Sequence, residues 1–238
     1  MRPIGKTDKG RRRKNNQDIF SVGELPVGKV VIVCDGMGGV SGGGYASTKC
    51  SDTIDTYLRR MLASSSNVNL RSVMLGAIYE ANKVLYNISN NNPVLKGMGT
   101  TAVVCLRGKD KLHIAYVGDS RCYMIRNKKM TQLTRDHSVV WELVELGRIT
   151  PEEAKLHPDR HVITKAVGVE QEIQPEYKEV SVKESDIIVA CTDGLHGYLD
   201  ETEIYDIIVN NEPEKAVSML VEQVNMRGGP DNITVVIF

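Results

Sequence analysis

The sequence has no net charge, no long apolar run and few cysteines, and each of these absences excludes a class of protein. Its 238 residues carry 30 Lys and Arg against 30 Asp and Glu, so no overall field attracts nucleic acid or an anionic membrane. No apolar run approaches the ~20 residues of a transmembrane helix. Residues 1–14 are basic without an apolar segment behind them, which is unlike a signal peptide. We therefore expect a cytoplasmic chain that binds neither membrane nor nucleic acid.

The cysteines number five, and no two of them form a C-x-x-C pair. Cys34, Cys105 and Cys191 lie in apolar, strand-like runs, where thiols usually serve as small buried hydrophobes. The His residues are scattered along the chain, so the spacing of a zinc site is missing. This usage predicts a reduced protein without a disulfide framework.

The hydrophobic pattern predicts strands in blocks, separated by pairs of helices. The expected strands cover residues 18–22, 30–34, 100–106, 112–117, 121–125, 130–133, 173–177, 187–191 and 232–238. The expected helices cover residues 46–62, 73–88, 201–209 and 213–226. Short connections within residues 100–133 predict that its four strands form one antiparallel meander.

This order of elements predicts a mixed α and β fold with two mainly antiparallel sheets packed face to face and helices outside. No repeat, linker or low-complexity stretch divides the chain, so we expect a single domain over residues 1–238. Residues 136–167 are charged, helix-prone and rich in His, and we interpret them as an inserted helical flap.

Five aspartates stand at the boundaries of predicted strands, and three of them are flanked directly by Gly; they are Asp18, Asp35, Asp119, Asp193 and Asp231. Gathered at one edge of a sandwich, these carboxylates would repel one another and be forced to protonate unless a counter-charge were present. Mg²⁺ and Mn²⁺ prefer such oxygen ligands. The pattern therefore indicates a metal cluster and the two-metal hydrolysis of a phosphoester, with ions about 3.5–4 Å apart.

Other binding sites match the sequence less well. Residues 36–44 lie between a strand and a helix but lack the G-x-G-x-x-G register of a dinucleotide loop, and no G-x-x-x-x-G-K-[ST] occurs. The basic run at residues 11–14 is either a solvated turn or a loop that turns one Arg inward to hold a phosphate.

Six segments resemble, in order, the motifs of the metal-dependent protein Ser/Thr phosphatases of type 2C (the PPM family), in their bacterial branch. Their sequences are RKNNQD (13–18), DGMGG (35–39), GMGTT (97–101), VGDSR (117–121), TDGL (192–195) and GPDN (229–232). The similarity extends from residue 5 to residue 238, and the flap resembles that branch as well. It implies a four-layer α/β/β/α sandwich that binds Mn²⁺ or Mg²⁺, two ions with a candidate third.

The resemblance also implies a role for each matching residue. Asp35 would bridge two ions, and the Gly36 carbonyl with Asp18, through water, would complete the first site. Asp193 and Asp231 would hold the second ion.

The remaining matches concern the third ion and the substrate. Asp119, together with Asp193 of the second site, would hold the third ion. Arg13 would bind the substrate phosphate. Arg13 therefore joins Asp35 and Asp193 as an expected catalytic residue, while Ser138 and His161 of the flap are candidate substrate contacts. Some family members carry a His as general acid where this chain has Met37.

The implied activity is hydrolysis of phosphoserine and phosphothreonine in proteins by a metal-activated water that attacks phosphorus. The implied partners are phosphorylated proteins, the products of a Ser/Thr protein kinase, in a signalling role, and we expect a monomer. Two alternatives on the same fold stay open at this point: a pseudophosphatase that only binds phosphoproteins, and a small-molecule phosphatase. The metal aspartates expected of an active enzyme are all present, and a nuclease would need a basic or aromatic surface.

Overall fold

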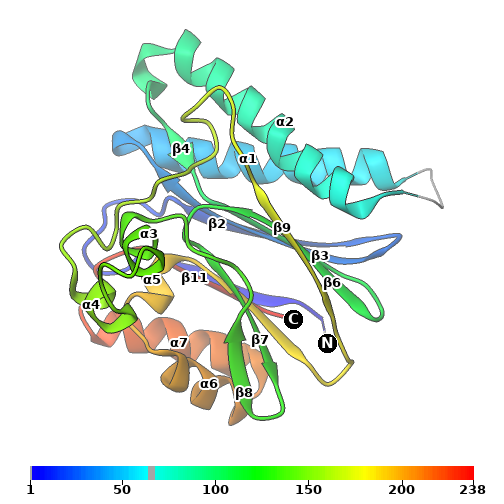
Figure 1. Cartoon of the computed structure of the whole chain (residues 1–238), viewed down its shortest axis with the longest axis vertical. Coiled ribbons are helices and arrows are strands. Elements are labelled where there is room, and N and C mark those ends of the chain that lie inside the picture. The colour runs from blue at the N-terminus through cyan, green and yellow to red at the C-terminus, as the bar shows by residue number, and fades with distance from the viewer. Residues whose placement is uncertain (1, 64–67) are drawn as a thin grey trace.

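The computed structural model describes residues 2–63 and 68–238, which form four layers in the order helix, sheet, sheet, helix (Figure 1). The helices α1 (Gly39–Leu62) and α2 (Leu70–Asn91) cover one sheet, and α6 (Glu201–Val209) and α7 (Pro213–Met226) cover the other. The expected sandwich of two antiparallel sheets between helices is confirmed.

The sheet beneath α1 and α2 begins with the predicted hairpin. Its strand order is β2 (Asp18–Leu25), β3 (Gly28–Met37), β5 (Ala102–Arg107), β6 (Lys111–Val117) and β9 (Glu176–Ser181), and β4 (Gly99–Thr100) also pairs with β3. The last strand was expected at residues 173–177 but begins later, because Pro175 just before it has no N–H for a ladder.

The second sheet joins the two ends of the chain. Its order is β1 (Ile4–Asp8), β11 (Ile233–Ile237), β10 (Ile187–Cys191), β7 (Arg121–Arg126) and β8 (Lys129–Gln132). Strand β1 escaped prediction because its sequence IGKTD has no apolar alternation, and it forms by pairing with the final strand β11.

Strand β3 is buried on both faces, as its apolar run predicts. Val30, Ile32 and Cys34 belong to the core under α1 and α2, whereas Val31 and Val33 belong to the core between the sheets. Burial of each large side chain in such a position stabilises the fold by about 1.5–3 kcal/mol. The end of this strand is therefore a fixed platform for whatever follows it.

The predicted single meander over residues 100–133 is wrong, because its four strands divide between the two sheets. β5 and β6 pair in the first sheet and β7 and β8 in the second. The chain changes sheet at Gly118, whose φ of 101° is open mainly to glycine. A Cβ at Gly118 would lie 2.6 Å from Cγ2 of Thr101. Asp119 is thereby placed where the chain passes from one sheet to the other.

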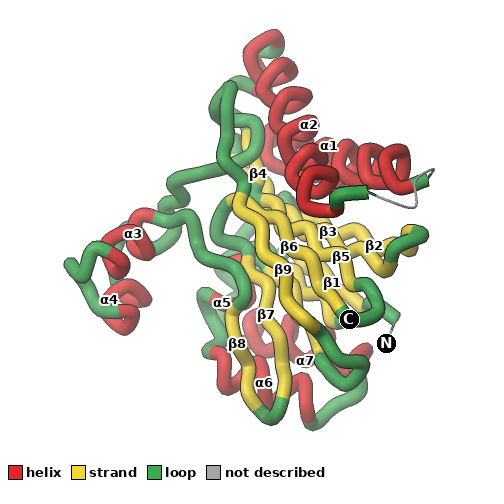
Figure 2. Tube along the Cα trace, turned by 45° about the vertical axis from the view of Figure 1, so that its right-hand side comes forward, coloured by secondary structure: helices red, strands yellow, loops and turns green. Residues whose placement is uncertain are grey.

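The flap stands away from the sandwich as two short helices, α3 (Val139–Glu145) and α4 (Pro151–Leu156) (Figure 2). Its two ends are joined at the base by an isolated bridge between Ser138 and Ile163. The N–H of Thr164 also donates to the carbonyl of His137 at 2.8 Å. The short elements η1 (Pro93–Leu95) and α5 (Asp193–His196) complete the fold.

All five cysteines are free and buried, which agrees with their expected role as small hydrophobes. None of the helices in residues 2–63 and 68–238 combines the length and the apolar composition that crossing a bilayer requires.

Candidate metal centre

The two aspartates of the first hairpin lie directly opposite each other. Asp18 opens β2 and is the ladder partner of Asp35 in β3, a placement that like charges disfavour. Asp18 is 7% exposed, and its Oδ2 accepts hydrogen bonds from the hydroxyls of Thr192 and Thr234 at 2.8 Å each. Within the described part of the chain, its buried Oδ1 has no hydrogen-bond partner. An unmet buried acceptor costs about 1–3 kcal/mol, so this oxygen is a place for a further ligand.

Two adjacent threonines fix the backbone of Asp35. The N–H of Asp35 donates to Oγ1 of Thr101 at 2.9 Å, and the Asp35 carbonyl accepts from the N–H of Thr101 and the hydroxyl of Thr100, at 2.8 Å each. The Thr101 hydroxyl also lies 2.7 Å from that of Ser120. The end of β3 that carries Asp35 is thereby joined to the turn that carries Asp119.

Arg13 is held beside Asp231. Its Nη2 donates to Oδ2 of Asp231 at 2.7 Å. The next residue, Asn232, fixes the loop that carries Arg13: its Oδ1 accepts from the N–H of Gln17 at 2.8 Å, and its Nδ2 donates to two carbonyl oxygens in the stretch 9–15. Asn232 belongs to the GPDN segment (229–232). Its role as a clamp depends on contacts with residues more than 200 positions away in the chain, so spacing in the sequence does not predict it.

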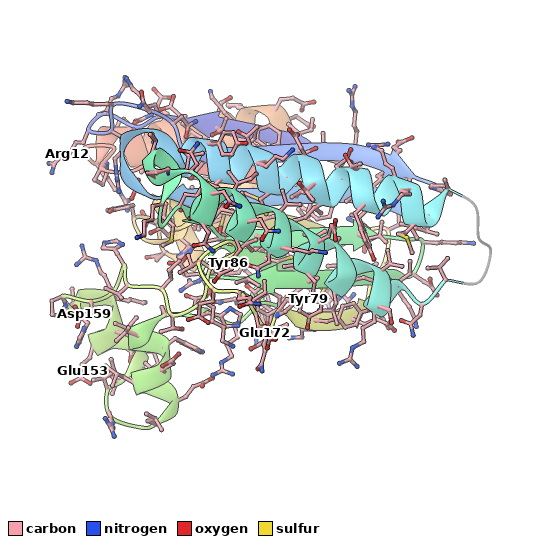
Figure 3. The ribbon with its side chains drawn as sticks, turned by 90° about the horizontal axis from the view of Figure 1, so that it is seen from above. Arg12, Tyr79, Tyr86, Glu153, Asp159 and Glu172 are labelled. Atoms are coloured by element: carbon pink, nitrogen blue, oxygen red, sulfur yellow. The ribbon has the colours of Figure 1, made fainter. Side chains whose placement is uncertain are left out.

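A pocket of about 700 Å³ opens between this loop and the flap. Arg12 of the loop and Asp159 of the flap lie at the same end of the molecule in Figure 3. Of the residues with an expected role, those lining the pocket are Arg13, Asp35, Gly36, Asp119, His161, Asp193 and Asp231. Asp18 adjoins them through its ladder partner Asp35.

Ser138 lies outside the lining of this pocket among the described residues. Its Oγ accepts from the N–H of Trp141 at 3.3 Å and caps α3, and the residue is 2% exposed. The geometry gives no support to the substrate contact expected of Ser138.

His161 reaches from the flap over the aspartates. Its Nδ1 lies 3.4 Å from Oδ2 of Asp193, and its ring stacks on Tyr198 with centroids 6.5 Å apart. Tyr198 also lines the pocket. The sequence pattern carried no signal for Tyr198, because an aromatic after a short helix is usually a core residue.

Burial and mutual repulsion act on the aspartates that face one another. Burial, together with the charges of Asp193 and Asp231, raises the pKa of Asp18 to about 7 despite its two hydroxyl donors. Burial, with the charges of Asp18 and Asp193, raises the pKa of Asp35 well above its ordinary value. For the carboxyl of Asp119, burial and the charge of Asp193 raise the pKa in the same way.

Asp193 differs from its neighbours. Burial would raise the pKa of Asp193, but hydrogen bonds with His161 and Asp35 and the nearby imidazole of His196 hold it below its ordinary value. Asp193 is thus the member whose pKa is lowered, whereas the raised pKa values of Asp18, Asp35 and Asp119 mean that a bound cation would favour their ionised forms.

A family model described as protein phosphatase 2C matches residues 21–233 of the chain. The chain belongs to the protein phosphatase 2C family. The serine/threonine phosphatase stp of Listeria monocytogenes serotype 4b is 35% identical over 235 residues, covering 98% of this chain and 93% of that protein. The protein phosphatase PhpP of Streptococcus pneumoniae is 34% identical, covering 96% of this chain and 93% of that protein.

Solved protein phosphatase 2C structures share the whole fold. The serine/threonine phosphatase Stp1 from Staphylococcus aureus superposes with a TM-score of 0.92 at 31% identity, covering 99% of this chain and 93% of its own. The catalytic domain of PstP, solved with two manganese ions, gives 0.85 at 31% identity, covering 99% of this chain and 96% of its own. The family and the bacterial branch expected from the six motifs are confirmed.

The donor set of this protein phosphatase 2C chain fits a hard divalent cation. It offers carboxylate oxygens, one of them buried without a partner on Asp18, and burial raises the pKa of several members. In the described residues, no three His, Cys, Asp or Glu side chains are already arranged so that they could hold an ion. Arg13 and His161 lie instead against two of the carboxylates, those of Asp231 and Asp193.

Proposed function

We propose that this chain hydrolyses phosphoserine and phosphothreonine in proteins at the pocket between the Arg13 loop and the flap. The observation that carries the proposal is the convergence of four aspartates and one arginine on that pocket, because carboxylates gather in this way to hold cations for phosphoester hydrolysis. The membership in a family of protein phosphatases supports the same conclusion.

The residues that would hold the ions follow from their placement. Asp35 and the Gly36 carbonyl, with Asp18 behind them, would hold the first ion, and Asp193 and Asp231 the second. We infer that Asp35 would contact both ions, and its pairing with Asp18 and its hydrogen bond with Asp193 support this role. When bound, the ions lower the pKa of a water molecule and offset charge on the phosphoryl oxygens.

Asp119 is the proposed contributor to a third ion. It is 6% exposed and approaches the pocket from the turn between the two sheets. Because Asp119 belongs to neither of the first two sites in this proposal, its loss would affect the third ion and leave the ligands of the other two in place.

Arg13 positions the substrate. Its guanidinium lines the pocket and carries five N–H donors in a planar fork, which suits a phosphoryl group. The Asn232 clamp holds its loop in place before substrate arrives, so little conformational entropy is lost when the phosphate binds.

The leaving seryl oxygen must gain a proton from somewhere other than residue 37. Met37 lines the pocket at the position where some family members carry His, and a thioether does not titrate. His161 lies beside the proposed second site, with its Nδ1 3.4 Å from Oδ2 of Asp193. It stays the candidate substrate contact of the flap.

Several finer statements belong to this proposal. The substrates are products of a Ser/Thr protein kinase, because such enzymes form the ester bonds that this pocket would break, and the chain has a signalling role. The chain acts as a cytoplasmic monomer, and its buried free thiols support the cytoplasmic location. Mn²⁺ and Mg²⁺ both suit an all-oxygen donor set.

A direct assay tests the proposal. The chain is incubated with a phosphothreonine peptide or p-nitrophenyl phosphate, in Mn²⁺, in Mg²⁺ or in EDTA. We expect metal-dependent release of phosphate from the peptide that Asp193→Ala abolishes. The matched control Asp206→Ala, at an exposed position on α6, should retain full activity. Binding of the peptide without release of phosphate would instead identify a pseudophosphatase, and hydrolysis of p-nitrophenyl phosphate alone a small-molecule phosphatase.

A further inference from the structure

A buried histidine, His137, hydrogen-bonds both the N–H and the carbonyl of Gly118, the residue that precedes Asp119. The backbone N–H of His137 donates to the carbonyl of Gly118 at 3.0 Å. The ring Nδ1 of His137 accepts from the N–H of Gly118, also at 3.0 Å. Gly118 is the residue at which the chain changes sheet, and Asp119 follows it directly.

These contacts fix the tautomer of His137. A backbone amide can only donate, so Nδ1 is the acceptor and the ring proton resides on Nε2. Nε2 then donates to Oε1 of Glu176 at 3.1 Å, and the hydroxyl of Tyr116 donates to Oε2 of the same carboxylate at 2.7 Å. The Tyr116 ring stacks on the His137 ring with centroids 5.6 Å apart and planes at 16°. Both ring nitrogens and one ring face of His137 are therefore fixed.

The same residue joins the Asp119 turn to the flap. The carbonyl of His137 accepts from the N–H of Thr164, on the returning end of the flap. On the other side of the turn, Nε2 of His196 donates to the carbonyl of Asp119 at 3.0 Å. Two histidines thus hold the backbone of this turn, His137 at Gly118 and His196 at Asp119, and His137 belongs to the base of the flap.

We propose that His137 is a positioning residue that sets the direction in which the Asp119 carboxylate enters the pocket and couples that direction to the base of the flap. His137 does not act on the substrate, because it is 4% exposed and lies outside the lining of the pocket among the described residues. The proposal rests on the proposed function, in which Asp119 helps to hold a cation. Loss of such an outer partner typically lowers metal affinity or activity about 10- to 100-fold.

The chain contains a matched control for this proposal. His113, on the same strand that leads into Gly118, is 6% exposed, and its Nδ1 lies 2.6 Å from the hydroxyl of Tyr177. His113 is about as buried as His137, but its ring bonds Tyr177 on β9, whereas the ring of His137 bonds Gly118 in the turn that carries Asp119. A role in folding alone would make the two histidines equivalent.

Two substitutions at His137 separate the contacts of the ring. In His137→Asn the side-chain oxygen takes the place of Nδ1 and keeps an acceptor for the N–H of Gly118. In His137→Gln the longer side chain reaches toward Glu176 and leaves that N–H without its partner. Tyr116→Phe removes the hydroxyl that donates to Glu176 and accepts from the N–H of Arg135 at 3.2 Å, and it serves as a milder variant if His137→Gln does not fold.

The experiment measures kcat and KM for the phosphothreonine peptide against Mn²⁺ concentration, and hydrogen exchange of the Gly118 amide in EDTA. We expect His137→Gln to lower kcat at least tenfold with little change in KM, to need more Mn²⁺, and to exchange the Gly118 amide faster. His137→Asn should restore most of the wild-type kcat, Mn²⁺ requirement and Gly118 amide exchange rate. Tyr116→Phe should lower kcat a few fold, and kcat of His113→Gln should stay within twofold of the wild type.

Three results would overturn the proposal while leaving the proposed function intact. They are wild-type kcat and Mn²⁺ dependence in His137→Gln, equal losses in His137→Asn and His137→Gln, and an equal loss in His113→Gln. Should His137→Gln not fold, wild-type kcat in Tyr116→Phe would count against the proposal in the same way. A wild-type chain that releases no phosphate with Mn²⁺ would overturn the proposed function first, and the role of His137 with it.

Discussion

Asp35 illustrates how a single residue can serve a site at the expense of the fold. It is surrounded by the carboxylates of Asp18, Asp193 and Asp119, and burial together with these charges raises its pKa well above the ordinary value. Without a cation, folding must either protonate Asp35 or tolerate the repulsion, and both cost free energy. Residues kept despite such a cost are typical of functional sites.

Asp35→Asn should therefore stabilise the metal-free protein. Removing the ionisable group removes the free-energy cost of burying or protonating it. We expect the free energy of unfolding to rise by about 1 kcal/mol, which for a chain of this size raises the Tm by about 2–4 °C. Thermal unfolding in EDTA at pH 8 measures this. Asp206→Asn should leave the Tm unchanged, and a lower Tm for Asp35→Asn would show that the carboxylate stabilises the fold.

Arg13→Ala should act on the substrate more than on the reaction step. A guanidinium that binds the phosphate in ground and transition states alike contributes mainly to KM. Loss of hydrogen bonds to a charged group is worth about 1.5–3 kcal/mol, so we expect KM for the phosphopeptide to rise at least tenfold. The neighbouring substitution Arg12→Ala is the control. An unchanged KM of Arg13→Ala in steady-state kinetics would show that Arg13 belongs to a solvated turn and does not bind the phosphate.

Among the secondary-structure elements, the sequence pattern predicts where a strand lies better than it predicts which other strand it pairs with. The strand β3 and its hairpin partner β2 form as expected, because apolar runs and short turns are local properties. The assignment of β7 to the second sheet was missed, because it depends on the conformation of Gly118. Strand β1 was missed because only β11, at the far end of the chain, makes it a strand.

The turn between β9 and β10 is held by one buried carboxylate. Asp186 is 3% exposed and accepts from Nε and Nη2 of Arg126 at 2.9 and 2.5 Å and from the N–H of Lys183 at 2.6 Å. The hydrogen bonds from Arg126 lower the pKa of Asp186 below its ordinary value and outweigh the opposing effect of burial.

Asp186→Asn should destabilise the protein in a pH-dependent way. A carboxyl whose pKa is lower in the folded state stabilises the fold above its unfolded pKa of ~3.9, and this contribution is lost as the pH falls through the folded value. We expect the free energy of unfolding to drop by about 1.5 kcal/mol at pH 7. The difference from the wild type should shrink below about pH 4. Urea titrations at several pH values measure this, and a difference that is constant down to pH 3 would contradict the role of the charge.

For the whole molecule, the pocket exists because both sheets end at it. Asp18 and Asp35 come from the first sheet. In the second sheet, Asp193 opens α5 just after β10 and Asp231 lies just before β11, while Asp119 comes from the crossing between the sheets. The five aspartates were predictable because each follows or precedes an apolar strand, a local signal. The supporting residues Asn232, Tyr198 and His137 were not, because each acts through contacts between distant segments.

The central claim is that these aspartates form a metal centre, and Mn²⁺ binding at equilibrium tests it most directly. Calorimetry on the wild type, Asp35→Asn and the exposed control Asp206→Asn counts the ions for each chain, independently of any substrate. We predict two tightly bound Mn²⁺ for the wild type and for Asp206→Asn, and loss of tight binding in Asp35→Asn with the fold intact. A wild type that binds no Mn²⁺, or an Asp35→Asn chain that binds as many ions as tightly as the wild type, would contradict the account.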